Sequence, residues 1–173
     1  MRIAIVGNPG SGKSTLAAQL HAITKVPVYH LDQYYWKPKW QRPDQDAFAT
    51  AHHALCDKEE WIIEGVATRI LEYRIQRADI VIFFDMPTIV CLYRLFRRAF
   101  LGFGKEGFAS PKGCPEGVPS WEIIRFIWRF NRDKKPIILN LLQIYKQKHI
   151  FVIKSNAELC KTINYFQKIY NQV

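Results

Sequence analysis

Residues 7–15, GNPGSGKST, constrain the fold of this chain more than any other segment. They fit the pattern G-x-x-x-x-G-K-[ST], with the apolar run Ile3–Val6 before them and the helical pattern Leu16–Leu20 after them. Such a strand–loop–helix unit turns its backbone N–H groups towards phosphates, and the helix N-terminus adds partial positive charge. The segment therefore predicts a phosphate-binding loop. The dinucleotide pattern G-x-G-x-x-G is absent, which disfavours a Rossmann dehydrogenase.

This loop supplies the expected binding site for ATP with Mg²⁺. Lys13 is placed to reach the β- and γ-phosphates, and the hydroxyl of Ser14 to bind Mg²⁺. The other expected nucleotide-binding residues of the loop are Gly7, Asn8, Pro9, Gly10, Ser11, Gly12 and Thr15.

Short apolar runs alternate with longer helical patterns, which predicts an α/β fold with a parallel sheet. The length of 173 residues suits a single domain, 1–173. The expected strands are mostly continuous apolar runs, as in sheets buried on both faces: Ile3–Val6, Pro27–Leu31, Trp61–Ile63, Ile80–Phe84 and Ile150–Ile153. Helices are expected near residues 13–22, 44–57, 67–77, 88–100, 120–132, 136–147 and 157–170.

Composition narrows the setting of the protein. No apolar run approaches the roughly 18 residues of a membrane span, and the first apolar run is too short for a signal-peptide core. The four cysteines are scattered, so we expect reduced thiols rather than a disulfide framework or a zinc site. We expect a cytoplasmic monomer with no membrane partner.

Residues 102–119, GFGKEGFASPKGCPEGVP, interrupt the alternation of runs. Five of the nine glycines and three of the nine prolines fall here, between two helical patterns. A loop this long inside a compact domain is usually functional. We interpret it as a short mobile lid, with a disordered surface insertion as the alternative.

Polar residues follow each expected strand, where ligands of open α/β sheets bind. Glu64 follows the third strand and is expected to hold Mg²⁺ directly or through water, together with Ser14. Asp85 follows the fourth strand and is interpreted as a helix cap. Ser155 and Asn156 follow the fifth.

Asp32 follows the second strand and begins the stretch DQYYW, with basic residues after it. A carboxylate there can orient an acceptor hydroxyl and take its proton, while the rings of Tyr34, Tyr35 and Trp36 stack a planar group. The alternative is a surface turn whose aromatic rings pack on the core. His30 is interpreted as a packed residue at the end of the strand.

Basic residues gather in one part of the chain. Residues 86–154 carry thirteen Lys/Arg against four Asp/Glu, whereas residues 1–85 carry ten of each, which suggests an anionic partner for the later region. Arginines flank the expected lid on both sides: Arg94, Arg97 and Arg98 before it, and Arg125, Arg129 and Arg132 after it. They suit charge stabilisation during phosphoryl transfer; a solvated face or a nucleic-acid backbone contact are the alternatives.

With these pieces in place, the chain resembles the adenylate-kinase-like P-loop kinases, and within them the bacterial DNA topology modulation proteins. The resemblance runs in order along nearly the whole chain, through GNPGSGKST, HLDQYYWKPKW, WIIEG, ADIVIFFDMP, CLYRLFRR, GCPE and HIFVIKS.

The resemblance implies a three-layer fold with five parallel strands in the order 2-3-1-4-5, ATP and Mg²⁺ as cofactors, and a closing lid. It implies catalytic roles for Lys13, for Arg94 and Arg98 in the pattern R-x-x-x-R, and for the lid-return arginines Arg129 and Arg132. Glu64-Gly65 replaces the family's D-G, and the loop with Ser155 and Asn156 would lie near adenine.

The chain departs from the family at two places, and the second disfavours AMP as the acceptor. The four-cysteine zinc lid of some adenylate kinases and the AMP-binding G-D-x-x-R after the second strand are both missing. The segment HLDQYYW looks more like uridine kinases, in which the acid activates a sugar hydroxyl.

These features predict an ATP-dependent phosphotransferase acting on a nucleoside, nucleotide or similar small acceptor, with Asp32 as the catalytic base. The alternative is a nucleotide-gated regulator that binds nucleic acid through the basic region; we expect any such binding to be weak and sequence-independent.

Overall fold

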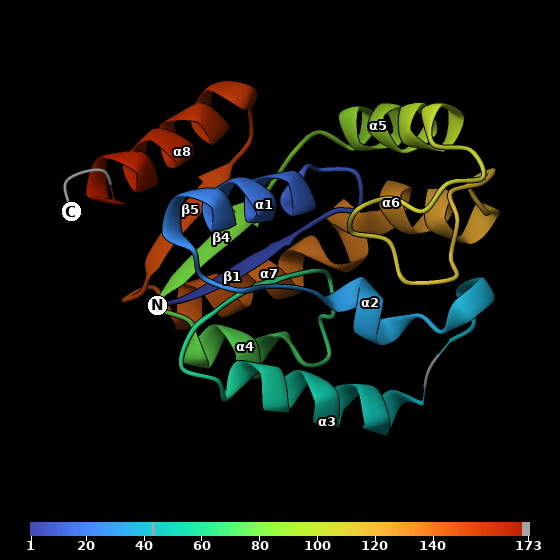
Figure 1. Ribbon diagram of the computed structural model, residues 1–173. Helices are drawn as coiled ribbons and strands as arrows, with labels where there is room; N and C mark the ends of the chain where they lie inside the picture. Colours follow the sequence, from blue (N-terminus) through green and yellow to red (C-terminus); the bar gives the residue numbers. More distant parts are fainter. Residues whose placement is uncertain (43, 171–173) are drawn as a thin grey trace.

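The computed structural model describes residues 1–42 and 44–170. Its centre is a five-stranded, all-parallel sheet with the order β2-β3-β1-β4-β5, as expected (Figure 1). Register places Glu64 beside Ile5 and Phe84 beside Gly7, so the carboxyl ends of the central strands share one edge. The strands are β1 (Arg2–Gly7), β2 (Val28–His30), β3 (Trp61–Glu64), β4 (Ile80–Phe84) and β5 (His149–Ile153).

Helices cover both faces of the sheet, which completes the expected three layers (Figure 1). One face packs on α1 (Lys13–Thr24), α5 (Thr88–Leu101) and α8 (Asn156–Tyr170), through side chains such as Leu16, Leu95 and Phe166. The other face packs on α3 (Gln45–Cys56), α4 (Leu71–Arg77) and α7 (Lys135–Ile144). Helix α6 (Trp121–Asp133) buries Ile127 with the first group and Phe130 with the second.

The chain departs from the predicted elements just after the second strand. That strand was expected to run through Leu31, but β2 ends at His30, and Leu31 opens the short helix α2 (Leu31–Tyr35). Leu31 is buried against Gly65, where an added Cβ would lie 2.8 Å from the Cβ of Leu31, so its burial anchors this turn. A 3₁₀ turn, η1 (Pro38–Trp40), follows. The helix expected over 67–77 begins only at Leu71.

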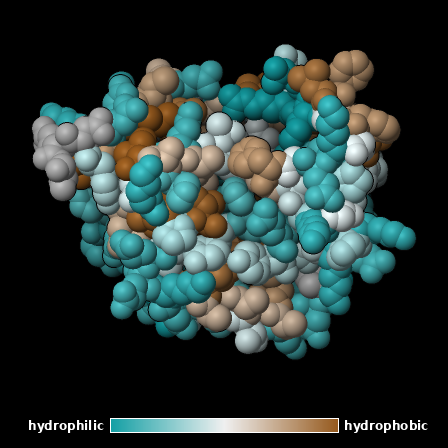
Figure 2. All heavy atoms as spheres, in the orientation of Figure 1, coloured by the Kyte–Doolittle hydropathy of each residue, from teal (hydrophilic) through white to brown (hydrophobic). Residues whose placement is uncertain are grey.

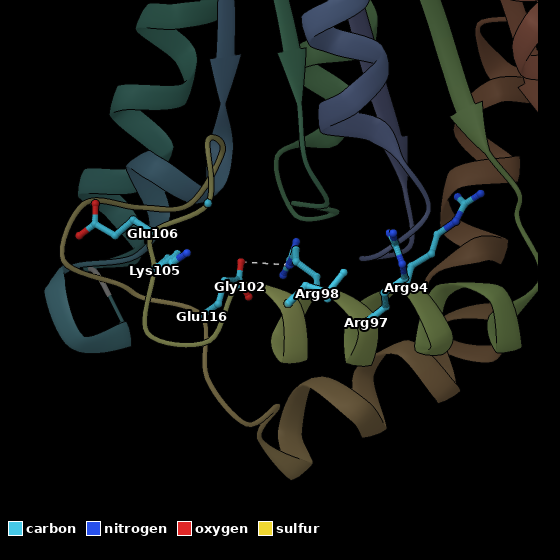
Figure 3. A pocket seen from close by; sticks show the side chains of 9 residues that line it. Arg94, Arg97, Arg98, Gly102, Lys105, Glu106 and Glu116 are labelled. Carbon is cyan, nitrogen blue, oxygen red and sulfur yellow. Dashed lines mark ion pairs between the residues drawn. The ribbon is translucent and has the colours of Figure 1, made fainter.

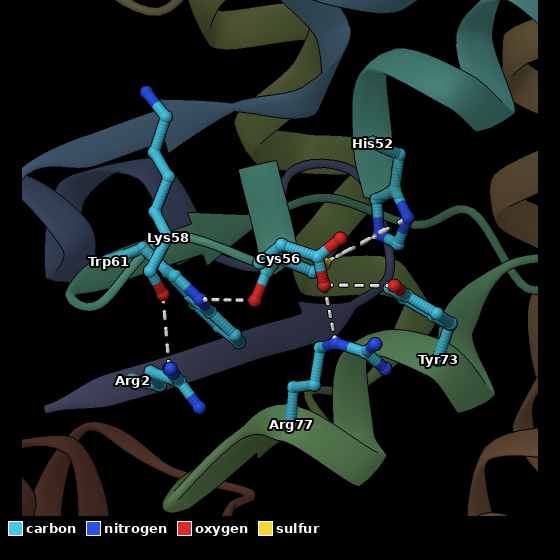
Figure 4. Close-up of polar contacts among 8 residues, drawn as sticks. Arg2, His52, Cys56, Lys58, Trp61, Tyr73 and Arg77 are labelled. Atoms are coloured by element: carbon cyan, nitrogen blue, oxygen red, sulfur yellow. Dashed lines mark hydrogen bonds and ion pairs between the residues drawn. The ribbon is translucent and has the colours of Figure 1, made fainter. Parts of the chain in front are cut away.

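Polar contacts fasten α3 to the sheet and to α4 (Figure 4). The indole of Trp61 on β3 donates to the carbonyl of Cys56 at 3.1 Å, and Arg2 on β1 donates to the carbonyl of Lys58 at 3.1 Å. Tyr73 and Arg77 of α4 both bond to Asp57, which follows α3, at 2.8 and 2.6 Å. These contacts hold α3, which follows α2 and η1, in place against the sheet.

The expected lid joins α5 to α6 without regular structure of its own. Within it, the backbones of Gly104 and Lys105 pair with that of Glu116, through N–H···O contacts of 2.8 Å in both directions. Among the described residues, no helix is both long and apolar enough to cross a membrane.

Candidate active site

The phosphate-binding loop is shaped by close contact with the elements around it. Gly7 and Gly10 have φ values of 153° and 77°, in the region that favours glycine. A Cβ added to Gly7 would lie 2.6 Å from the carbonyl oxygen of Phe84, and one on Gly10 would meet the carbonyl oxygen of Cys91 on α5. Asn8 donates to the carbonyl of Ile127 on α6 at 3.1 Å. The loop is therefore held between the sheet, α5 and α6.

Lys13, the first residue of α1, points back into this loop. Its side chain is buried, and Nζ donates to the carbonyl of Asn8 at 2.9 Å. Burial lowers the pKa of Lys13, while the negative charges of Glu64 and Asp32 oppose that shift and favour the ammonium form. Lys13 is thus a buried amine held at the phosphate-binding loop, with two acidic groups that favour its charged form.

Glu64 receives two hydrogen bonds on one carboxylate oxygen. The hydroxyl of Ser14 and Nδ1 of His30 both lie 2.8 Å from Oε1. Burial would raise the pKa of Glu64, but the His30 hydrogen bond, the charge of Lys13 and the Ser14 hydrogen bond outweigh it and lower the pKa. Glu64 is therefore a buried carboxylate, held in its charged form.

These oxygens fit a Mg²⁺ ion of the kind that phosphate-binding loops hold. Mg²⁺ prefers hard oxygen donors, and is usually bound by one or two carboxylates together with substrate phosphates. Ser14 and Glu64 supply a hydroxyl and a carboxylate at contact distance. Among residues 1–42 and 44–170, no group of three or more His, Cys, Asp or Glu side chains could hold a metal ion by protein ligands alone.

Asp32 is the second residue of α2 and lies two residues after His30, where β2 ends. Crowding by protein atoms raises its pKa and the negative charge of Glu64 adds to the rise, whereas Lys13 and Arg98 lower it. Asp32 also keeps an exposed surface, and solvent there limits these effects. The pKa of the carboxyl is thus raised, which makes it a better proton acceptor when ionised.

Two arginines of α5 reach the centre from the other side. Arg94 donates to the carbonyl of Ser11 in the phosphate loop at 2.7 Å and to Oδ1 of Asn156 at 3.2 Å. Arg98 pairs with Glu116 of the lid at 3.0 Å, and its charge acts on both Lys13 and Asp32. Figure 3 shows both side chains at the rim of a hollow of about 400 Å³ between α5 and the lid.

The other residues singled out in the sequence contact neighbours on or near their own helices. Ser155 accepts a hydrogen bond from the backbone of Glu158 at 3.2 Å, as a helix cap does, and Asn156 begins α8 beside Arg94. Arg129 and Arg132 both pair with Asp133 on their own helix, at 2.9 and 2.8 Å. Asp85 pairs with Lys135 at 2.6 Å, and α5 has no side-chain cap, so interpreting Asp85 as a cap was wrong.

The expected lid is joined to the segment after α2. Lys39 donates from its backbone to Gly113 at 2.9 Å, and the indole of Trp40 donates to Pro115 at 3.3 Å. The buried thiol of Cys114 donates to the carbonyl of Lys37 at 3.3 Å. These contacts join the expected lid to residues 37–40, so that the two segments form one continuous surface. Phe108 extends it to His30, with ring centroids 5.9 Å apart.

Sequence reasoning missed two of the site's polar residues. His30 holds Glu64, and Glu116 holds Arg98 while also accepting from Ser110 at 3.2 Å. The signal for His30 was its place directly before Leu31-Asp32. The signal for Glu116 was an acid within a basic lid, in the segment GCPE.

The sequence of this chain is similar to one curated protein. No family model matches the chain. The chain is 32% identical over 112 residues to a curated relative, the uncharacterized protein YqaC of Bacillus subtilis (strain 168). The match spans 62% of this chain and 62% of that protein, so the chain covers about three fifths of the length of its relative.

Solved structures share the fold along its full length. A shikimate kinase from Acinetobacter baumannii, solved in complex with shikimate, aligns with a TM-score of 0.60 at 15% identity, over 97% of this chain and 89% of that one. A deoxyadenosine kinase from M. mycoides, with products dCMP and dCDP, aligns with a TM-score of 0.56 at 18% identity over 99% of each chain. A shikimate kinase from Aquifex aeolicus vf5 aligns with a TM-score of 0.51 at 20% identity, over 97% of this chain and 96% of that one. The chain therefore shares the fold of these kinases.

Proposed function

We propose that this protein is an ATP-dependent phosphotransferase whose acceptor is a small molecule with a hydroxyl group, such as a nucleoside. One observation carries the proposal. Glu64 accepts a hydrogen bond from Ser14 of the phosphate loop at 2.8 Å, and the same oxygen lies 2.8 Å from Nδ1 of His30, two residues before Asp32. The phosphate-binding residues and a proton-accepting carboxyl therefore lie around one centre.

In this proposal, different residues bind the phosphates, stabilise charge and accept the proton. The N–H groups of the loop and Lys13 hold the nucleotide phosphates, and Arg94 and Arg98 stabilise charge that develops during transfer. Mg²⁺, held through Ser14 and Glu64, would neutralise charge on the phosphate oxygens when bound. The oxygen of the acceptor hydroxyl bonds to the γ-phosphorus, and the bond from that phosphorus to ADP breaks. Asp32 takes the proton that the hydroxyl loses.

Local charge supports a hydroxyl rather than a phosphate as the acceptor group. Two carboxyl groups, Asp32 and Glu64, face this side of the centre, and each disfavours a second anion nearby. A neutral hydroxyl meets no such penalty and has a proton that Asp32 can accept. Uncharged acceptors stacked against exposed rings such as Tyr34 and Phe108 are the best match.

Consumption of ATP in the presence of a panel of nucleosides, nucleotides and small polyols tests the proposal. We expect acceptor-dependent ADP formation with at least one neutral hydroxyl compound and Mg²⁺. Turnover restricted to nucleoside monophosphates would contradict the hydroxyl assignment, and acceptor-independent hydrolysis alone would contradict the transferase assignment.

A nucleic-acid-binding regulator related to DNA topology modulation proteins is the second candidate, favoured by the basic charge of residues 86–154. Four of the lid-flanking arginines are engaged within the chain, by Ser11 and Asn156, by Glu116, and by Asp133. We therefore expect only weak DNA binding that falls steeply with salt. Tight, sequence-selective binding near physiological salt would favour the regulator instead.

A further inference from the structure

Helices α5 and α6 each expose a row of large side chains to solvent. On α5, Ile89, Tyr93, Phe96 and Phe100 are 49–84% exposed. On α6, Trp121 and Trp128 are 73% and 68% exposed, and Arg125 and Arg132 are exposed between and after them. Monomeric proteins rarely leave so many large apolar side chains together in water.

The spacing of both rows is the same. Residues 89, 93, 96 and 100 on α5, and residues 121, 125, 128 and 132 on α6, follow the steps of four, three and four that keep side chains on one helical stripe. Such stripes are the seams along which helices of a bundle pack together. We call these the α5 seam and the α6 seam.

The two seams lie on neighbouring helices. Helices α5 and α6 pack against each other, and Asn131 near the end of α6 donates to the hydroxyl of Thr88 at the start of α5 at 3.2 Å. The helices therefore run antiparallel, side by side (Figure 1). Figure 2 shows apolar side chains gathered over α5 at the upper right, with hydrophilic side chains among them.

We propose that this surface binds a second copy of the chain, with the α5 seam of each copy packed on the α6 seam of the other around a two-fold axis. The seams are complementary in this arrangement. The α5 seam is aromatic and uncharged, whereas the α6 seam alternates tryptophan with arginine. Each arginine of one copy then meets the aromatic rings of its partner, a favourable cation–π contact, rather than another arginine.

Area and composition both suit such a dimer. Five aromatic side chains at these exposures present on the order of 700 Å², given about 150–250 Å² for a fully bared ring. Ile89 and the stems of the arginines add to this, which reaches the roughly 800 Å² per partner of a stable interface. Aromatic residues and arginine are the types enriched at the centres of interfaces.

The seams leave the candidate active site free. Arg94 and Arg98 lie on α5 as well, but they reach away to Ser11 and to Glu116. The charge of Arg132 is balanced by Asp133 at 2.8 Å, which limits repulsion between copies. The proposed dimer is therefore independent of the proposed kinase activity, and it differs from the monomer predicted from the sequence.

Sedimentation velocity over roughly 1–100 µM protein tests the proposal, since interfaces of this size associate at micromolar concentration or below. We expect a concentration-dependent dimer of the full chain. Phe96→Glu on one seam and Trp128→Glu on the other should each weaken dimerisation at least ~30-fold, the scale of a buried hot spot. The matched control is Ile169→Glu on α8, which is 45% exposed and should leave the dimer unchanged.

Arg125→Glu provides a second variant that cannot disturb the core, because Arg125 is already exposed and charged. It should also weaken the dimer, with circular dichroism and melting temperature unchanged. A monomer at every concentration would overturn the proposal, and so would a dimer that tolerates all three seam variants. A monomer that binds vesicles of anionic phospholipid, and loses that binding with Trp128→Glu, would assign the surface to lipid instead.

Discussion

The two sides of the candidate active site are built in different ways. The nucleotide side is a contiguous motif whose residues bond to the sheet and to a neighbouring helix, as Ser14 does to Glu64 and Asn8 to Ile127. The acceptor side is assembled from two irregular segments far apart in sequence, residues 37–40 and the lid. Local sequence specifies the first side, and tertiary contacts specify the second. We therefore expect the nucleotide side to tolerate no change and the acceptor side to respond in a graded way.

The largest effect should come from Lys13→Ala. Removing the only side-chain cation of the phosphate loop should lower turnover by roughly 10²–10³-fold, the scale of losing one charge-stabilising donor. It should also abolish most of the rise in melting temperature that ATP with Mg²⁺ gives the wild type. Differential scanning fluorimetry with and without nucleotide measures this shift. An undiminished shift in the variant would place the nucleotide elsewhere.

Asp32→Asn should separate the two sides. The variant keeps the shape of the side chain but cannot accept a proton, so turnover should fall by about 10²-fold or more while ATP binding is nearly intact. Arg94→Ala should also lower turnover, through lost charge stabilisation. The measurement is turnover of both variants on the acceptor found in the panel. If Asp32→Asn matches the wild type while Arg94→Ala is impaired, a phosphate acceptor becomes the better interpretation.

Lowering the pH should decrease the stability of the fold through a buried histidine on α3. His52 on α3 is fully buried, and burial, with the nearby charge of Arg74, lowers its pKa to about 3. The unfolded chain binds a proton at this residue below about pH 6.5, whereas the folded chain does not until far lower pH. Stability is therefore lost as pH falls through this window, by about 2 kcal/mol between pH 7 and pH 5.

His52→Leu removes that titration. The free energy of unfolding, from urea denaturation at both pH values, should decline less with acid in the variant by about 2 kcal/mol. The exposed His149→Leu on β5 serves as the control and should follow the wild type. Parallel declines in wild type and His52→Leu would show that His52 is protonated in the folded protein.

The smallest expected effect concerns the lid. Glu116 positions Arg98, so Glu116→Gln should lower turnover about tenfold, with ATP affinity unchanged within about twofold, because Arg98 loses a charged partner. Glu106→Gln, in the same lid, removes an exposed acid that accepts from the backbone of Gly113 at 2.8 Å, and should change little. Equal losses in both variants would point to general lid damage rather than to the position of Arg98.

The mobility of the lid is tested by limited proteolysis of the wild type. Cleavage within residues 102–119 should decrease when ATP and acceptor are both present. Equal cleavage with and without ligands would count against closure.

Sequence predicted the fold and the strand–loop–helix arrangement around residues 7–15, because both depend on local patterns. Continuous apolar runs mark strands buried on two faces, and the glycine–lysine motif fixes its own loop. It placed Asp32 beyond the second strand but missed the short helix α2, since the burial of Leu31 against Gly65 is a contact between distant segments. Nor could it assign Arg98 to Glu116, or the lid to Trp40, because no periodicity or spacing encodes pairings between irregular segments.

The close approach of Gly10 to the carbonyl of Cys91 has a mechanical consequence. Together with the bond from Arg94 to Ser11, it clamps the first half of α5 to the phosphate loop. Any swing of the lid must then pivot beyond Arg94, in the last turns of α5 towards Gly102, while the root of the helix stays still. We therefore expect the first half of α5 to be the fixed support about which a closing lid would turn.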